Sequence, residues 1–377
     1  MTIQRCVPVS QPLLDEAESN CVNDALLKGA ISGFFGDYIT RFEEEFSNYC
    51  DCQYGVATSN GTSALHLALV SLGIKTGDEV LVSTFTNMAT IFSILYIGAK
   101  PVPIDIEMDT LNLDPSLLER HISPWTKAIL VVHLFGHPVD MDSVLDVAKK
   151  HSLFVVEDCA EAHGATYKGR KVGSIGDAGC FSFYANKIIT TGEGGMVTFC
   201  ESSLADKARN LRGLAFGDTN KFMHKDVGFN YRLTNIQAAI GHAQFGKIEH
   251  VIASKRSIAA YYSKRLANVD GLQFPVEKSY ARNVYWMYHL VLSGPNIGRR
   301  NEIMRKLSEV GIDTRETFIP FNLQDIFIKQ GLVNSGDCPN ANSVAYAGFY
   351  LPSGAGLTEE DLDYVATQFV EIIEKKS

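Results

Sequence analysis

The 377-residue sequence contains no long hydrophobic run, and its first residues lack a basic stretch followed by an apolar one. Its longest strongly apolar segment, AILVV at 128–132, is far shorter than the roughly 18 residues that a transmembrane helix needs. Basic residues are outnumbered by acidic ones, which gives a formal net charge of −9. Nucleic acids and anionic membranes bind clustered basic charge, so we expect neither as a partner and predict a soluble, cytoplasmic protein.

The cysteines lack the spacing that two common kinds of site require. The eight cysteines show no repeated interval, and Cys50 and Cys52 form a C-x-C pair without a second pair. Neither a disulfide framework nor a zinc site is therefore indicated, and we expect mostly buried thiols and no metal. No G-x-G-x-x-G segment follows the first predicted strand and opens a helix, which disfavours a nucleotide-binding oxidoreductase.

Short apolar runs alternate with amphipathic segments between residues 54 and 200. The runs are YGVATS, EVLVST, KPVPIDI, AILVVHLFG, LFVVEDC, GCFSFY and GGMVTF, and helical patterns such as TSALHLALVSLG lie between them. This alternation predicts a large α/β domain with a mostly parallel sheet covered by helices. Ligands of such sheets bind beyond the carboxyl ends of the strands, so residues just after the runs are candidates for chemistry.

The second half of the chain predicts a bridging helix and a smaller domain. A long helical pattern begins at Thr234, a suitable N-cap, and breaks near Gly246. Beyond about residue 255 strand and helix signals mix, and a final helix follows Thr358. We therefore predict a large domain over 1–250, including an N-terminal arm, and a small C-terminal α+β domain over 251–377.

The segment ATSNGTSALHLAL indicates an anion site at the start of a helix. A strand ends at about Ser59, Gly61 allows a tight turn, and Thr62 and Ser63 begin the helix. The unpaired backbone N–H groups at a helix start point toward an anion, so a phosphate would fit there. An ordinary capped helix gives the same pattern, and this segment alone does not distinguish the two.

Two further segments place ionisable side chains after apolar strands. VVEDCAEA brings Glu157 and Asp158 to the sheet edge, where an inward carboxylate would meet a cationic ring nitrogen; a solvated strand edge is the alternative. In FSFYANKIITTGEGG, Lys187 follows apolar residues and precedes a glycine-rich turn. Burial there would disfavour its ammonium form and leave a nucleophilic amine. Alternatively, its stem packs on apolar residues while its head reaches water.

The three signals together favour a cofactor enzyme over the separate alternatives. An anion site, a carboxylate and a desolvated lysine, each after a different strand, are the parts that hold pyridoxal 5'-phosphate. We therefore predict that this cofactor binds between Gly61, Asp158 and Lys187.

Several segments resemble the DegT/DnrJ/EryC1/StrS family of sugar aminotransferases, a branch of the fold-type I pyridoxal-phosphate enzymes. They are ISGFFGDYITRFEEEF, SNGTSALHLAL, VHLFGHPVDM, EDCAEAHGATYKGRKVGSIGD, FSFYANKIITTGEGGMV and VGFNYRLTNIQAAIG. The resemblance covers most of the chain and thins after about residue 255. It implies a large domain with a mostly parallel seven-stranded sheet sandwiched by helices, followed by a small α+β domain.

The segments EDCAEA, NKIITTGEGGM and VGFNYRLTNIQAAIG are most similar in sequence to those of the GDP-perosamine synthase subgroup. This resemblance implies transfer of the amino group of L-glutamate to C4 of GDP-4-keto-6-deoxy-D-mannose, in O-antigen and lipopolysaccharide biosynthesis. UDP- or dTDP-4-keto-6-deoxyhexoses are alternative substrates. An alternative function is that of a regulatory protein that binds the cofactor without turnover. Relatives that dehydrate sugars at C3 carry histidine in place of the lysine, so Lys187 favours transamination.

The resemblance also implies roles for individual residues. Lys187 would bond covalently to the cofactor and then move a proton at the donor's α-carbon, while Asp158 would keep the ring nitrogen protonated. The other cofactor contacts would come from Gly61, Thr62 and Ser182 at the phosphate, Phe85 against the ring, Glu161 beside the phenolic oxygen, and Asn230 reaching the phosphate from the neighbouring subunit. The active site would then be shared within a homodimer.

Some of these assignments leave alternatives open. Phe85 could instead be a core phenylalanine. Arg232 could bind an anionic group of a substrate or form a structural ion pair. Glu161 stands where many relatives have glutamine, and a carboxylate beside a phenolic oxygen should be protonated or repelled. His133 and His163 lie near strand ends, where each would either contact a ligand or be an interior group. The loop TRETFIPFN departs from its relatives, so the substrate is less well defined than the chemistry.

Overall fold

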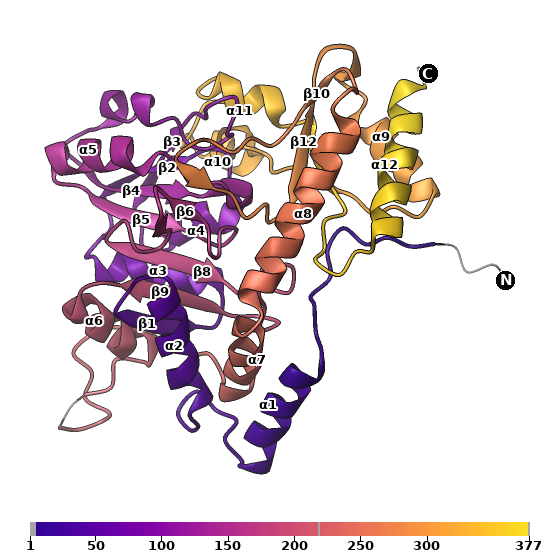
Figure 1. The fold of residues 1–377 in the computed structure, drawn as a ribbon. Helices are drawn as coiled ribbons and strands as arrows, with labels where there is room; N and C mark the ends of the chain where they lie inside the picture. The colour runs from indigo at the N-terminus through magenta and orange to yellow at the C-terminus, as the bar shows by residue number, and fades with distance from the viewer. Residues whose placement is uncertain (1–4, 218, 376–377) are drawn as a thin grey trace.

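The computed structural model describes residues 5–217 and 219–375. Its larger part is an α/β unit built on a seven-stranded sheet, and a smaller unit follows toward the C-terminus (Figure 1). The strands lie in the spatial order β1 (Tyr54–Thr58), β9 (Gly195–Phe199), β8 (Ala178–Ser182), β5 (Phe154–Asp158), β4 (Thr126–Val132), β2 (Glu79–Ser83) and β3 (Lys100–Ile104). Neighbours pair in parallel except at β9, which runs antiparallel to both β1 and β8. The mostly parallel sheet predicted from the alternating runs is confirmed.

Amphipathic helices flank this sheet. In α5 (Met141–His151) the buried side chains are Met141, Val144 and Ala148, a helical spacing that turns one stripe toward β4 and β5. The other helices of the large unit are α1 (Glu16–Leu27), α2 (Tyr38–Tyr49), α3 (Gly61–Ser71), α4 (Met88–Tyr96), α6 (Ser202–Arg212) and α7 (Asn235–Phe245). α3 packs against β8 and β9, which places its first turn beside the carboxyl end of β8.

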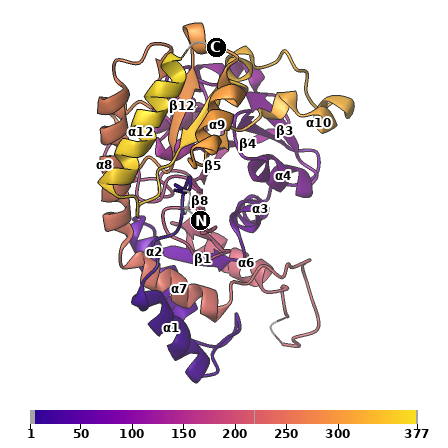
Figure 2. The same cartoon turned by 90° about the vertical axis from the view of Figure 1, so that its right-hand side faces the viewer.

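Two consecutive helices carry the chain from the large unit to the small one. α7 begins after Thr234, whose side chain accepts a hydrogen bond from the Gln237 N–H, and it ends at Gly246, both as predicted. α8 (Ile248–Leu266) then runs along the molecule to the small unit (Figure 1). In Figure 2, α1, α2 and α7 lie together at the base, and α8 runs beside α12 (Glu359–Glu374). Residue 250 lies in the first turn of α8, and our division of the chain there stays a prediction.

The small unit is an antiparallel sheet with helices. Its strands follow the order β10 (Leu272–Gln273), β12 (Tyr288–Leu292), β14 (Gly348–Leu351) and β13 (Arg315–Glu316). Its helices are α9 (Arg300–Glu309), α10 (Asp325–Lys329), α11 (Pro339–Val344) and α12, which begins after the predicted cap Thr358. A separate three-stranded sheet joins β11 (Ala281–Arg282) to β6 (Thr166–Tyr167) and β7 (Arg170–Lys171). Single 3-10 turns lie at Pro115–Leu117, Glu119–His121, Leu134–Gly136, Gly294–Asn296 and Phe321–Leu323.

The N-terminal arm lies against the small unit before the chain enters α1 (Figure 1). Arg5 forms ion pairs with Glu360 at 3.0 Å and Asp361 at 2.8 Å, at the start of α12. Val7 forms a parallel bridge with Ile312, so the arm follows one edge of the small unit. Arg5 and Val7 therefore hold the arm against the small unit.

The eight cysteines are all free thiols, and five of them are buried, so most of the thiols are buried as predicted. Within residues 5–217 and 219–375, no helix is both long enough and apolar enough to cross a membrane.

Candidate active site

A cavity of about 560 Å³ opens at the carboxyl edge of the large sheet. Six of the eight predicted site residues line it: Gly61, Thr62, Asp158, Glu161, Ser182 and Lys187. They come from α3, from β5 and the turn after it, and from β8 and the turn that follows. The parallel strands bring their carboxyl ends to one edge, which is why residues far apart in sequence meet here.

Asp158 ends β5 and points into the cavity. Its two carboxylate oxygens accept hydrogen bonds from the Ala160 N–H at 3.1 Å and from the Thr90 hydroxyl at 2.9 Å. Burial raises the pKa of Asp158, and these two donors together with the charge of Lys187 offset part of that rise. A cationic ring nitrogen beside this carboxylate would stabilise its ionised form further.

Glu157, the preceding residue, belongs to the interior instead. Its carboxylate accepts hydrogen bonds from the backbone N–H groups of Gly173, Ile175 and Gly176 at 2.8 to 2.9 Å, and lies 3.0 Å from His133 Nε2. His133 Nδ1 accepts the Val139 N–H, so its Nε2 carries the proton donated to Glu157. Glu157, His133 and Cys159 bring potential metal ligands within 4.8 Å of one another, but the carboxylate and both ring nitrogens are already hydrogen-bonded within the protein.

Lys187 lies in the turn after β8, with its amine inside the cavity. Its Nζ lies 4.0 Å from the centroid of the Trp286 ring and 3.9 Å from a carboxylate oxygen of Glu161. Burial lowers the pKa of Lys187, and the carboxylates of Glu161 and Asp158 offset part of this effect. A larger fraction of the amine is therefore unprotonated, which is what a nucleophilic lysine requires.

Trp286 is fixed over Lys187 by hydrogen bonds at both ends. Its indole N–H donates to the Asn186 carbonyl at 2.7 Å, and its own carbonyl accepts a hydrogen bond from Lys255 at 2.8 Å. Lys255 is wholly buried in α8 and also donates to the Ser353 carbonyl at 2.9 Å. The ring that covers the reactive amine is thus tied to the helix that joins the two units.

Glu161 faces Lys187 from the turn after β5. One of its oxygens accepts the Phe135 N–H at 2.8 Å, and the other lies toward the lysine. Burial raises the pKa of Glu161 to about 7, with Lys187 and the Phe135 N–H working in the opposite direction. Near neutral pH this carboxyl group therefore exists in both forms, and its neutral form is a hydrogen-bond donor to an oxygen anion.

The start of α3 and the end of β8 together form an anion cradle. Asn60 caps the helix by accepting the Ser63 N–H at 2.8 Å, which leaves the first amides of the helix directed outward. A Cβ atom built on Gly61 would lie 2.8 Å from the Ser182 Cβ, so only glycine lets the helix approach this hydroxyl so closely. Backbone N–H groups and a hydroxyl at a helix start suit a phosphate group.

The residues of this cavity fit pyridoxal 5'-phosphate. An amine with a lowered pKa, a buried carboxylate and an anion cradle face one space. The Asn186 side-chain oxygen, which also belongs to a lining residue, is buried and has no hydrogen-bond partner within the described part of the chain. A buried polar atom left unbonded in a cavity is typical of a site that a ligand completes.

Two predicted site residues lie outside the cavity. Phe85 is wholly buried and packs edge-on against Phe135 and Phe318, and its predicted contact with the cofactor ring stays a prediction. Two residues further on, Asn87 lines the cavity instead. Asn230 is exposed on the loop between α6 and α7, so its predicted reach into a neighbouring subunit stays a prediction.

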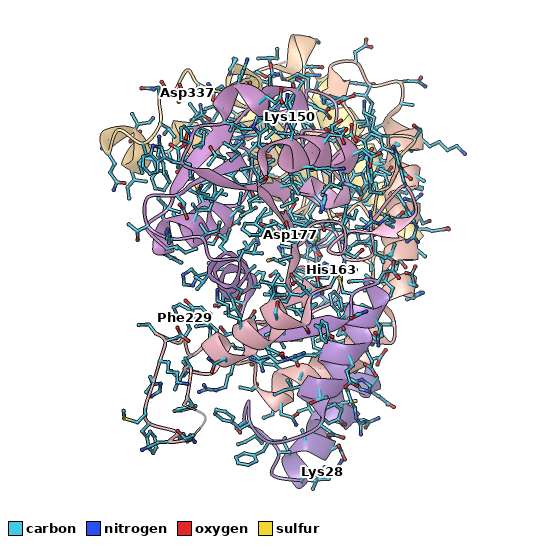
Figure 3. The ribbon with its side chains drawn as sticks, turned by 90° about the vertical axis from the view of Figure 1, so that its left-hand side faces the viewer. Lys28, Lys150, His163, Asp177, Phe229 and Asp337 are labelled. Atoms are coloured by element: carbon cyan, nitrogen blue, oxygen red, sulfur yellow. The ribbon has the colours of Figure 1, made fainter. Side chains whose placement is uncertain are left out.

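Arg232 and His163, for which the sequence left two roles open, are also not among the residues that line the cavity. The guanidinium of Arg232 lies over the Phe34 ring, 4.5 Å from its centroid. His163, labelled in Figure 3, is wholly buried among phenylalanine rings, and neither nitrogen has a hydrogen-bond partner among the described residues. Burial lowers the pKa of His163 to about 3, so it is neutral and unsuited to act as a base.

Sequence reasoning missed the cavity residues that the small unit contributes. Trp286, Arg315 and Tyr350 all line the cavity, although they come from segments where the resemblance is thin. Thr90, the hydroxyl partner of Asp158, was also missed, since a threonine inside a helix carries no signal of its own.

Comparison with known proteins agrees with this geometry. The sequence profile described as the DegT/DnrJ/EryC1/StrS aminotransferase family matches residues 12–370. The GDP-perosamine synthase of Caulobacter vibrioides is 41% identical over 97% of this chain and 98% of its own length. The GDP-perosamine synthase of Escherichia coli O157:H7 is 39% identical over 98% of this chain and 99% of its own length.

Solved structures extend the similarity to three dimensions. DesV from S. venezuelae is 33% identical, with a TM-score of 0.90 over 98% of this chain and 100% of its own. PseC from Helicobacter pylori, an aminotransferase of pseudoaminic acid biosynthesis, is 27% identical, with a TM-score of 0.93 over 99% of this chain and 100% of its own. The fold and the site thus define a pyridoxal-phosphate-dependent sugar aminotransferase. The chain belongs to the DegT/DnrJ/EryC1/StrS aminotransferase family.

Proposed function

We propose that this enzyme transfers the amino group of L-glutamate to C4 of GDP-4-keto-6-deoxy-D-mannose and so forms GDP-perosamine. The observation that carries the chemistry is the Lys187 amine, which lies in one cavity with Asp158 and the α3 anion cradle. The sugar is supported by three relatives named GDP-perosamine synthase, which are 37 to 41% identical over at least 94% of this chain. A Streptomyces venezuelae relative that is 36% identical is named as a transaminase of a dTDP-sugar, so dTDP- and UDP-4-keto-6-deoxyhexoses are the competing substrates.

The residues of the cavity divide the reaction among them. When bound, pyridoxal phosphate supplies an electron sink that stabilises negative charge on the donor's α-carbon. Asp158, ionised beside a cation, holds the proton on the ring nitrogen. Lys187 removes the proton from the donor's α-carbon and returns one to the product carbon, for which its lowered pKa is suited. Gly61, Thr62 and Ser182 hold the phosphate and so fix the distance to Lys187.

Replacing Lys187 tests the chemistry. The wild-type protein reconstituted with pyridoxal phosphate should show the long-wavelength absorbance of a lysine-bound cofactor, and Lys187→Ala should lack it and lose transamination. Lys329→Ala removes an exposed lysine on α10 and should leave both unchanged. A Lys187→Ala protein with the wild-type spectrum would contradict the assignment.

A substrate panel tests the sugar. GDP-, UDP- and dTDP-linked 4-keto-6-deoxy sugars are each incubated with enzyme and glutamate, and the product mass is measured. We expect conversion of the ketone to an amine in the GDP-linked compound, with slower conversion of the others. Preferential conversion of a UDP- or dTDP-linked sugar would replace the proposed substrate while leaving the chemistry intact.

We further propose that the enzyme is a homodimer with a shared active site. Large apolar side chains are exposed on the N-terminal helix region and on the loop between α6 and α7, among them Phe35 at 70%, Phe222 at 76% and Val227 at 86%. Exposed large apolar side chains gathered on a few segments are typical of a protein interface. Phe229, labelled in Figure 3 where that loop leaves the body, stacks on Tyr231 one residue beyond Asn230. The loop that carries Asn230 would therefore be part of the interface.

A further inference from the structure

The charged residues that line the cavity are mostly acidic. Asp158, Glu161, Glu193 and Glu316 contribute carboxylates, whereas the lining cations in the described part of the chain are Lys187 and Arg315. Both substrates of the proposed reaction are anions, because glutamate carries two carboxylates and a nucleotide-linked sugar carries a diphosphate. Lys187 is committed to the chemistry, so an anionic ligand depends on Arg315 to offset the acidic lining.

The Arg315 side chain has no bonding partner in the part of the chain that the structure describes. Its guanidinium forms no hydrogen bond or ion pair with any residue in 5–217 or 219–375, although it lines the same cavity as several carboxylates. The adjacent Glu316 is already paired with Arg300 at 3.3 Å, so it does not neutralise Arg315. The guanidinium therefore keeps its planar set of donors for a ligand.

Tyr350 supplies an independent sign of a ligand. It is 5% exposed and lines the cavity, yet its hydroxyl has no hydrogen-bond partner in the described ranges. The Thr317 hydroxyl is bonded to His289 Nε2 at 3.0 Å. Burial and the charge of Glu161 raise the pKa of Tyr350, so the hydroxyl stays protonated and is a donor.

The two side chains are cross-strand neighbours. Arg315 on β13 lies directly opposite Tyr350 on β14, so both project from the same face of the small sheet. The Tyr350 ring lies 6.2 Å from the Trp286 ring, centroid to centroid, and Trp286 covers the Lys187 amine. This donor pair therefore lines the same cavity as the reacting groups.

We infer that Arg315 and Tyr350 form a second anion subsite, which binds the carboxylate of the amino donor or the diphosphate of the sugar nucleotide. The inference rests on the proposed function. The forked guanidinium matches either oxyanion with two parallel N–H donors, and the tyrosine hydroxyl donates to a further oxygen. The first anion cradle, at α3, holds the cofactor, so this subsite selects what reacts with it.

Calorimetric titration of the cofactor-loaded enzyme tests the subsite and distinguishes its two ligands. Succinate, a dicarboxylate with neither amine nor ketone, probes the carboxylate, and GDP with inorganic diphosphate probes the phosphates. The variants are Arg315→Met, which keeps an apolar stem, and Tyr350→Phe, which removes only the hydroxyl. Arg305→Met, which removes an exposed arginine of α9, is the control.

We expect Arg315→Met to weaken one class of probe by about ten- to hundredfold and Tyr350→Phe to weaken the same class by about two- to tenfold. Loss of succinate binding assigns the subsite to the donor, and loss of GDP and diphosphate binding assigns it to the nucleotide. Wild-type affinity of Arg315→Met for every probe overturns the inference. So does a wild-type enzyme with intact cofactor absorbance that binds none of the probes, an outcome that leaves the transaminase assignment standing.

Discussion

At the scale of single residues, the cavity makes the charge of Glu161 costly. In the unfolded chain this carboxyl group has its ordinary pKa of 4.5, whereas burial in the folded protein raises the pKa to about 7. Between these values the unfolded chain releases a proton that the folded protein retains. The contribution of Glu161 to stability is therefore complete below about pH 4.5 and is lost as the pH rises to about 7.

Glu161→Gln should remove this dependence on pH. Relative to the wild type, the cofactor-free variant should gain about 1–3 kcal/mol in free energy of unfolding between pH 5 and pH 8. Urea unfolding at both pH values measures the difference. Glu374→Gln changes an exposed carboxylate, and its free energy of unfolding should differ from that of the wild type by the same amount at both pH values. A flat profile for Glu161→Gln would mean that the carboxyl group ionises in the folded protein as it does in water.

Some residues of the site could be predicted and others could not, for a physical reason. Lys187 and Asp158 follow apolar strands at the sheet edge, so local sequence places them correctly in the cavity. Phe85 also follows a strand, but whether an aromatic ring turns to the core or to a ligand depends on packing that one sequence does not reveal. Trp286 gives no local signal, because its position over Lys187 arises only when the segment after α8 packs back against the large unit through β11 and β6.

At the scale of elements, the first turn of α3 depends on close approach to β8. Periodicity was sufficient to predict the strand before Gly61 and the helix after it, and Asn60 rather than a later residue proves to be the cap. The close approach of Gly61 to Ser182, which leaves no room for a Cβ atom, was not predictable, because it is set by how the helix packs on the sheet.

Gly61→Ala tests that approach. The added methyl group would push α3 away from Ser182 and should weaken binding of pyridoxal phosphate by about tenfold or more. Fluorescence titration of the cofactor-free protein measures the affinity. Gly246→Ala, whose nearest neighbour would be 3.4 Å from the new atom, should bind the cofactor as the wild type does. Equal affinity for Gly61→Ala would show that the phosphate is held elsewhere.

At the scale of the whole molecule, the proposed shared site can be tested by mixing two inactive variants. Lys187→Ala removes the amine of its own protomer, and Asn230→Asp would set a negative charge against the partner's phosphate. A hybrid dimer has one intact site of two, so an equal mixture with random exchange should recover about a quarter of the wild-type activity.

The matched mixture pairs Lys187→Ala with Asp158→Asn. Both residues lie in one protomer's cavity, so their hybrid contains no intact site and should stay inactive. Chromatography of differently tagged protomers confirms that exchange has occurred. Inactivity of exchanged Lys187→Ala and Asn230→Asp hybrids would show that Asn230 does not act across the interface.

The paired acids at the end of β5 also have an evolutionary consequence. Glu157 ties three backbone amides and His133 into the interior, while Asp158 faces the reacting groups. A duplicated copy of the gene that lost its activity but kept its fold would retain Glu157, whereas substitutions would accumulate at Asp158. These two adjacent positions therefore record whether a descendant is still under selection for catalysis or for shape alone.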